Sequence, residues 1–166
     1  EGADSGLVGA GVVALPWFDP AEVEGLRGRI VPIRVEGDPL FERRDVKAAV
    51  VRELEAVLGH NALIASNTSA LPITELAEAS VRPANFIGMH FFSPADKMPL
   101  VEVICGEQTG DEALAAAFDL AQQLGKTPIV VNDAPGFFTT RVIGKTISQG
   151  AQMVMEGIDP VLIEAA

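Results

Sequence analysis

The residues best suited to chemistry are a histidine and a glutamate in two neighbouring apolar runs. His90 follows the apolar residues FIGM in a predicted strand, and Glu102 lies in the next run, LVEVIC. A neutral imidazole can accept a proton near pH 7, and a carboxylate beside it can hold one tautomer and stabilise the charged ring. Histidines near the end of a strand in an open α/β sheet are also well placed for a ligand site. The two residues are therefore candidates for a base and its partner.

Both residues also have a purely structural interpretation. A lone histidine in an apolar strand is more often a core residue bonded to a backbone carbonyl, and Glu102 alone fits a solvated strand position. The polar run SNTS at 66–69 follows another apolar run. Such short side chains serve turns and helix caps more often than substrates. Residue type and spacing leave these interpretations open.

The elements that must position these residues alternate between helix and strand from about residue 42. Apolar residues recur at helical spacing over 46–58 and 112–124, and Pro72 suits the first turn of a helix that reaches about Ala79. We expect Thr109 or Asp111 to cap the second of these helices and Gly125 to end it. Strands are predicted over 62–66, 86–92, 100–105 and 127–132. The alternation predicts an α/β fold with a mostly parallel sheet.

The pattern changes after Asp133. Pro135 and Gly136 indicate a hinge, and 137–157 is predicted to form one long helix with an apolar side. We expect a domain boundary near 134. Together with an unassigned start, this gives three parts, at 1–38, 39–134 and 135–166.

Residues 1–38 stay unassigned, although 29–36 resemble a strand. Gly9, Gly11 and Ala14 follow a G-x-G-x-x-A pattern, with Glu36 further on, as in a dinucleotide-binding loop. Almost nothing precedes the glycines, however, and Pro16 would break the helix that the loop requires. A glycine-rich terminal segment, or a truncated or degenerate start of a dinucleotide-binding domain, is the favoured interpretation.

The composition excludes several classes of partner. The chain has 23 acidic and 12 basic residues and a formal net charge of -11, which argues against nucleic acids and anionic membrane surfaces. No apolar run is long enough to span a membrane. The single cysteine, Cys105, fits a reducing compartment, and two histidines with one cysteine do not indicate a metal site.

Four segments, in this order, are similar to the 3-hydroxyacyl-CoA dehydrogenase family, and especially to the α-subunit of the multifunctional fatty acid oxidation complex. They are FERRDVK at 41–47, SNTSALPI at 66–73, GMHFFSPADKMPLVEV at 88–103 and GKTPIVVNDAPGFFTTR at 125–141. The resemblance covers roughly residues 39–166. It implies a Rossmann-like, mostly parallel sheet with an incomplete N-terminal half, followed by the first helix of an all-α C-terminal domain.

The resemblance also implies a reaction, the NAD-dependent oxidation of L-3-hydroxyacyl-CoA to 3-ketoacyl-CoA in fatty acid β-oxidation. The matching positions are His90 as catalytic base, Glu102 as its partner, Ser69 and Thr140 toward the acyl-CoA substrate, and Glu42, Lys47 and Asn67 toward NAD. In the single-function members of the family an asparagine precedes the arginine of the PGF motif. This chain has Thr140 at that position, as the multifunctional α-subunits do, so the resemblance favours the multifunctional class. Residues 39–134 then form the C-terminal part of the NAD-binding domain, and 135–166 the beginning of the helical dehydrogenase domain.

We expect the chain to be incomplete at both ends, with reduced or no independent activity and weak or no binding of NAD. The second hypothesis is a non-catalytic remnant or a subunit-interaction module of such an enzyme. The third hypothesis is a different hydroxy-acid dehydrogenase of similar fold. In a full-length parent the resemblance implies a homodimer or a complex with a thiolase subunit. It implies a cytoplasmic location, or the mitochondrial matrix in a eukaryote.

Overall fold

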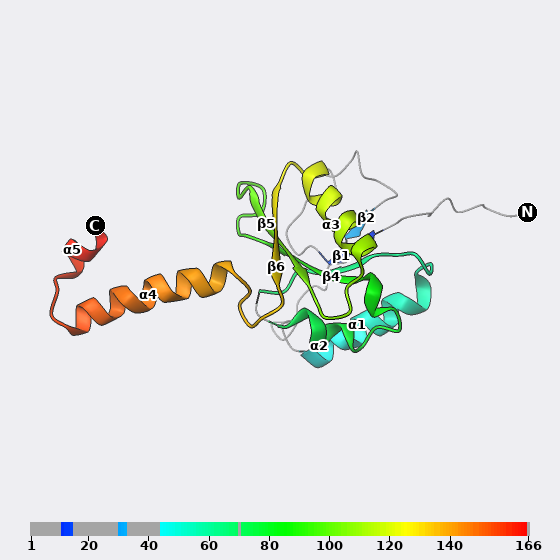
Figure 1. Ribbon diagram of the computed structural model, residues 1–166, viewed down its shortest axis with the longest axis horizontal. Coiled ribbons are helices and arrows are strands. Elements are labelled where there is room, and N and C mark those ends of the chain that lie inside the picture. The colour runs from blue at the N-terminus through cyan, green and yellow to red at the C-terminus, as the bar shows by residue number, and fades with distance from the viewer. Residues whose placement is uncertain (1–10, 15–29, 33–43, 70, 166) are drawn as a thin grey trace, which may run out of the picture.

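The computed structural model describes residues 11–14, 30–32, 44–69 and 71–165 (Figure 1). Within these residues six strands form one sheet, in the order β2-β1-β3-β4-β5-β6. The strands are β1 (Gly11–Ala14), β2 (Ile30–Pro32), β3 (Ile64–Ser66), β4 (Phe86–Phe91), β5 (Leu100–Cys105) and β6 (Thr127–Asn132). Neighbouring strands are parallel except for β4 and β5, which are antiparallel. The predicted α/β, Rossmann-like and mostly parallel class is confirmed.

Successive strands are added on one side of β1 and then on the other, so the order of the strands reverses next to β1. The chain passes from β1 outward to β2, whereas β3 pairs with the opposite side of β1. In open α/β sheets, ligands bind at such a switch point, beyond the carboxyl ends of the strands. The carboxyl ends of β1, β3 and β4 lie at this same edge because the three strands are parallel.

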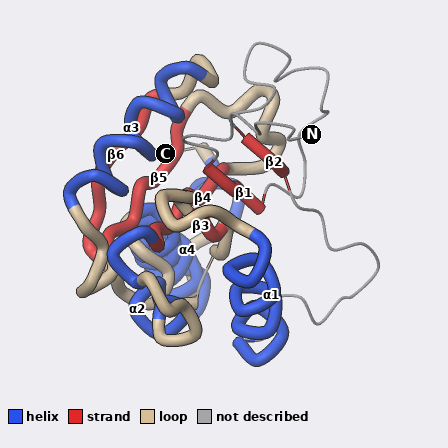
Figure 2. Tube along the Cα trace, turned by 90° about the vertical axis from the view of Figure 1, so that its right-hand side faces the viewer, coloured by secondary structure: helices blue, strands red, loops and turns tan. Residues whose placement is uncertain are grey.

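Helices cover both faces of the sheet, as Figure 2 shows, with α3 on one face and α1 and α2 on the other. The helices are α1 (Arg44–Val57), α2 (Ile73–Ala77), α3 (Asp111–Gln123), α4 (Thr139–Met155) and α5 (Pro160–Glu164), with a short 3₁₀ turn at Pro83–Asn85. Side chains alternate between the faces of a strand, so each face has its own core. The α3 face buries Ile87, Met89, Val101, Val103, Ala117 and Ala121. The α2 face buries Ile73, Leu76, Phe86, Ile104 and Phe137.

Gly88 allows α2 to approach the sheet closely. A Cβ atom at this position would lie 2.7 Å from Cδ1 of Ile73 and 2.9 Å from Cβ of Ile104. Both distances are shorter than real side chains tolerate, so only glycine fits between the helix and the strand. The first residue of α2 is thereby held directly on β4, on the face to which Gly88 and the alternate residues of that strand point.

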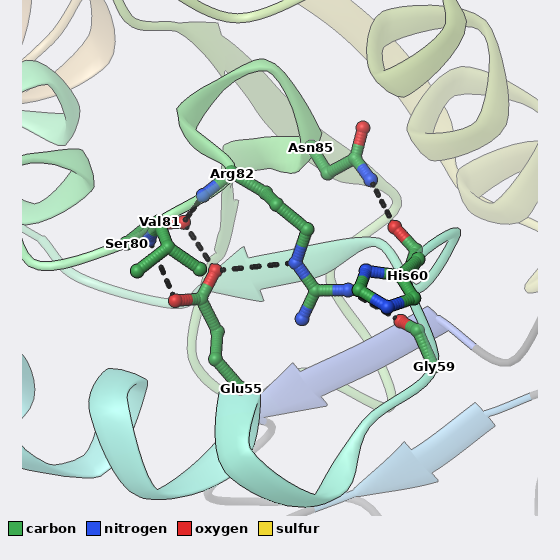
Figure 3. A network of polar contacts seen from close by, with 7 residues as sticks. All are labelled: Glu55, Gly59, His60, Ser80, Val81, Arg82 and Asn85. Atoms are coloured by element: carbon green, nitrogen blue, oxygen red, sulfur yellow. Dashed lines mark hydrogen bonds and ion pairs between the residues drawn. The ribbon is translucent and has the colours of Figure 1, made fainter.

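A polar network joins the end of α1 to the segment between α2 and β4 (Figure 3). The Glu55 carboxylate accepts hydrogen bonds from Oγ of Ser80 (2.5 Å) and the backbone N–H of Val81 (2.7 Å), and it pairs with Nε of Arg82 at 3.7 Å. Arg82 also donates to the carbonyl of Gly59. Burial alone would raise the pKa of Glu55, but these bonds and the Arg82 charge outweigh burial and lower it.

The long helix α4 projects from the sheet, as Figure 1 shows. None of its residues is buried, and Ile143, Ile147 and Met155 are 50%, 65% and 88% exposed. The predicted helix over 137–157 forms at Thr139–Met155, because the chain turns at both ends of the predicted range. The described part of the chain does not cover its apolar side. The domain boundary near 134 stays a prediction. No helix among the described residues is long and apolar enough to cross a membrane.

One local expectation differs from the structure. Gly110 occupies the N-cap position of α3 without a side-chain bond, so neither Thr109 nor Asp111 caps the helix. The Thr109 hydroxyl instead donates to the carbonyl of Phe86, which ties the start of β4 to the turn after β5. Gly125 follows α3 with φ of 69°, as expected of a residue that ends a helix.

The N-terminal segment is described only in part. Residues 30–32 of the predicted strand over 29–36 form β2, whereas we did not predict β1. Gly11 and Ala14 lie in β1, which argues against a phosphate-binding turn at these two positions. Gly9, Pro16 and Glu36 lie outside the described residues.

Candidate active site

The antiparallel pairing of β4 and β5 brings His90 and Glu102 together. The two residues are direct cross-strand partners, so their side chains leave the same face of the sheet. Nδ1 of His90 lies 2.7 Å from Oε2 of Glu102. His90 is 6% exposed and Glu102 is fully buried. The solvated interpretation of Glu102 is therefore wrong, and the partner of the imidazole is a carboxylate rather than a backbone carbonyl.

The second carboxylate oxygen of Glu102 binds the beginning of α4. Oε1 accepts hydrogen bonds from the backbone N–H groups of Phe138 (3.1 Å) and Thr139 (2.7 Å). These groups have no partner inside the helix, and the positive end of the helix dipole favours a negative charge beside them. The buried charge is thus stabilised by fixed donors instead of water.

The surroundings of Glu102 fix the state of the imidazole. A carboxylate only accepts hydrogen bonds, so Nδ1 of His90 must carry the hydrogen that it donates to Glu102. In the neutral ring, Nε2 then has the free lone pair and is the atom that can take up a proton. The pair can therefore act as a general base whose charged form is stabilised by Glu102.

Two phenylalanines border the imidazole. The ring of Phe92 lies 4.7 Å from that of His90, and the ring of Phe137 lies 5.9 Å away, measured between centroids. Phe137 is 1% exposed and has φ of 45°, a conformation that non-glycine residues seldom adopt. The turn before α4 is thus built so that an aromatic ring shields the base from water, which strengthens electrostatic interactions around it.

The loop after β3 adds polar groups beside the pair. Oδ1 of Asn67 accepts from the N–H of Phe91, the residue after His90, at 3.1 Å. Oγ1 of Thr68 accepts from the N–H of Leu71, so Thr68 serves the turn. Asn67 and Lys47 line one cavity between α1, β3 and β4, whose other walls are mostly apolar. Lys47 is 4% exposed.

The predicted site residues are therefore only partly brought together. His90 pairs with Glu102, and Lys47 shares a cavity with Asn67. Ser69 and Thr140 are exposed. Glu42 lies outside the described residues. We did not predict the contribution of the backbone amides at the start of α4, because backbone donors leave no mark in the residue types.

The fold and the pair of residues define a class of protein. It is a doubly wound α/β domain of the Rossmann type, with a polar site at the carboxyl edge of its parallel strands. The chain belongs to the 3-hydroxyacyl-CoA dehydrogenase family, because residues 37–134, more than half of its length, match the model of that family's NAD-binding domain. The resemblance inferred from the four sequence segments is confirmed.

Individual relatives agree with this assignment. The chain is 46% identical over 139 residues to the fatty acid oxidation complex subunit alpha of Idiomarina loihiensis, and the match covers 84% of this chain and 19% of that protein. The corresponding subunit of Colwellia psychrerythraea is 48% identical over 122 residues, with 74% and 17% covered. The chain thus spans about a fifth of these relatives.

Among solved structures, the (S)-3-hydroxybutyryl-CoA dehydrogenase of Ralstonia eutropha is similar, with a TM-score of 0.69 and 38% identity. The match covers 78% of this chain and 44% of that one.

Proposed function

We propose that this chain carries the base of an NAD-dependent dehydrogenase that oxidises L-3-hydroxyacyl-CoA to 3-ketoacyl-CoA in fatty acid β-oxidation. The observation that supports this most strongly is the buried bond between His90 Nδ1 and Glu102 Oε2, which leaves Nε2 as proton acceptor. The substrate hydroxyl proton would pass to Nε2 while the C–H hydrogen leaves as hydride. The nicotinamide, when bound, accepts that hydride.

The remaining site residues have proposed roles on either side of the base. Lys47 and Asn67 would face NAD, and both line the same cavity between α1 and β3. Glu42 would act on the same side. Ser69 and Thr140 would contact the acyl-CoA substrate, and the exposure of both side chains leaves them accessible to it.

A second candidate function is a subunit-interaction module. It is favoured by α4, whose apolar residues Ile143, Ile147 and Met155 are at least half exposed. Relatives are alpha subunits of a fatty acid oxidation complex, and we infer membership of such a complex, as a homodimer or with a thiolase subunit. Size-exclusion chromatography with light scattering, on the chain and on Ile147→Glu, would test pairing through α4. A cytoplasmic or matrix location stays a prediction from the family.

The dehydrogenase is tested by the acetoacetyl-CoA-dependent oxidation of NADH by the purified chain at high NADH concentration. His90→Gln should lower the rate at least about 100-fold, because a positioned base contributes about that much or more. His60→Gln is a matched control, since His60 is the only other histidine and is exposed. Equal rates for the His90 variant and the parent would refute the assignment of the base. A folded chain without turnover that pairs through α4 would favour the interaction module.

A further inference from the structure

Asp133, the first residue after β6, binds a helix that lies far away in the sequence. Its Oδ1 accepts a hydrogen bond from the N–H of Ile73 at 2.9 Å, and its Oδ2 accepts from the N–H of Thr74 at 2.8 Å. Both donors belong to the first turn of α2, which has no other side-chain cap. One carboxylate thus holds the beginning of this helix with two charge-assisted bonds.

The position of α2 matters for the site because the helix directly follows the loop that contains Asn67 and Ser69. Ile73 is fully buried and packs against Gly88. Gly88 and His90 point to the same face of β4, since they are two residues apart in the strand. The bond from Asp133 therefore fixes one end of the loop on the sheet face that carries the base. The other end is fixed by β3 and by the Asn67 bond to Phe91.

Asp133 also begins the linker to α4, and this linker is fixed at its far end as well. The N–H groups of Phe138 and Thr139 bind Glu102, and Phe137 between the two attachments lies beside the imidazole. One carboxylate thus ties the linker to the loop of Ser69, and another ties it to His90. The linker therefore connects the loop of Ser69 with the His90–Glu102 pair.

We propose that Asp133 is a positioning residue, which sets the conformation of residues 67–69 and 71–72 between β3 and α2 and so the placement of Ser69 relative to His90. Its importance for the substrate rests on the proposed dehydrogenase function. The effect on the loop itself does not, because the bonds to α2 exist in the chain without any ligand.

The first test is amide hydrogen exchange, measured by NMR on the free 166-residue chain. In Asp133→Ala the amides of Ile73 and Thr74 should exchange about tenfold faster, since each loses a hydrogen bond. The amide resonances of Asn67 and Ser69 should shift or broaden as well. Asp133→Asn keeps one acceptor oxygen and should give a smaller change, which makes the test usable if the alanine variant folds poorly.

The control is Asp159→Ala, which removes a comparable cap from α5, where Asp159 Oδ1 accepts from the N–H of Val161 at 2.9 Å. It should leave the resonances of Asn67 and Ser69 unchanged. If neither Asp133 variant altered the Asn67 and Ser69 resonances, or if Asp159→Ala altered them equally, the positioning role would be refuted.

The second test uses turnover of acetoacetyl-CoA with NADH. Asp133→Ala should raise KM about tenfold and change kcat far less, because a misplaced loop weakens substrate binding more than it changes the base. A fall in kcat with KM unchanged would overturn the proposal. Absence of turnover in the parent chain would count against the proposed function alone, and the exchange measurements would still decide the role of Asp133.

Discussion

Removal of the Glu102 carboxylate should have a large effect on stability. In Glu102→Ala the buried donor on His90 and the part-buried N–H groups of Phe138 and Thr139 lose their acceptor at once. A donor that is left without a partner in the interior costs about 1–3 kcal/mol, and bonds to a charged acceptor lie toward the upper end of that range. Because the three losses occur at one site and are not additive, we expect the free energy of unfolding to fall by about 3–5 kcal/mol. Urea denaturation of the variant and the parent measures this difference.

Glu102→Gln separates the stability role from the chemical one. The glutamine oxygen can still accept from the N–H groups of Phe138 and Thr139, so we expect a smaller loss of about 1–2 kcal/mol. Its NH₂ group, however, would face Nδ1 of His90, and two donors cannot bond. The ring should change to the tautomer with hydrogen on Nε2, which can no longer accept a proton there.

Nitrogen-15 NMR of the imidazole distinguishes the two tautomers directly. The parent should show hydrogen on Nδ1 of neutral His90, and the Gln variant should show it on Nε2. A cost below about 1 kcal/mol in Glu102→Ala, or an Nδ1–H tautomer in the Gln variant, would refute this role of the Glu102 carboxylate.

Other predictions concern packing, pH and thiol reactivity. Gly88→Ala should destabilise the chain by about 1–3 kcal/mol in urea, because its Cβ would meet Ile73, whereas Gly59→Ala, which has nothing within 4 Å, should not. The lowered pKa of Glu55 means that its stabilisation is complete above the ordinary carboxyl pKa and is lost as the pH falls through the lower folded value. As the pH is lowered from 6 to 3, the urea concentration at the midpoint of unfolding should therefore fall less steeply in Glu55→Gln than in the parent. The same dependence on pH in both proteins would contradict this. Burial raises the pKa of Cys105, so a thiol reagent at neutral pH should react far faster after unfolding than before.

Much of the sheet could be predicted because its apolar runs are long and bounded by turns. The runs at 86–92 and 100–105 correspond to β4 and β5, and the short connection between them is compatible with an antiparallel pair. The strand β1 has only four residues in a glycine-rich segment, and such a segment carries little periodic signal. Thr109 was expected at a cap, but a tertiary bond to Phe86 uses its hydroxyl instead.

The candidate site was predictable only in its side chains. Residue type and spacing left the roles of His90 and Glu102 open, and the resemblance of their segments to the family selected them. The register of β4 and β5 shows why they meet. The backbone amides that stabilise Glu102 could not be predicted, because any residue supplies an N–H group. Asp133 was visible only as the point where the composition changes, since its partners in α2 lie about sixty positions earlier.

The most direct test of the central claim is to observe the His90 imidazole while substrate binds. Acetoacetyl-CoA and NADH would be titrated into the isotope-labelled chain, with ring resonances of both histidines followed by NMR. We expect a saturable shift of the His90 ring resonances, mainly that of Nε2, while those of His60 stay unchanged. A His90 ring that does not respond under conditions where acetoacetyl-CoA binds, or responds no more than His60, would contradict the claim that His90 is the base.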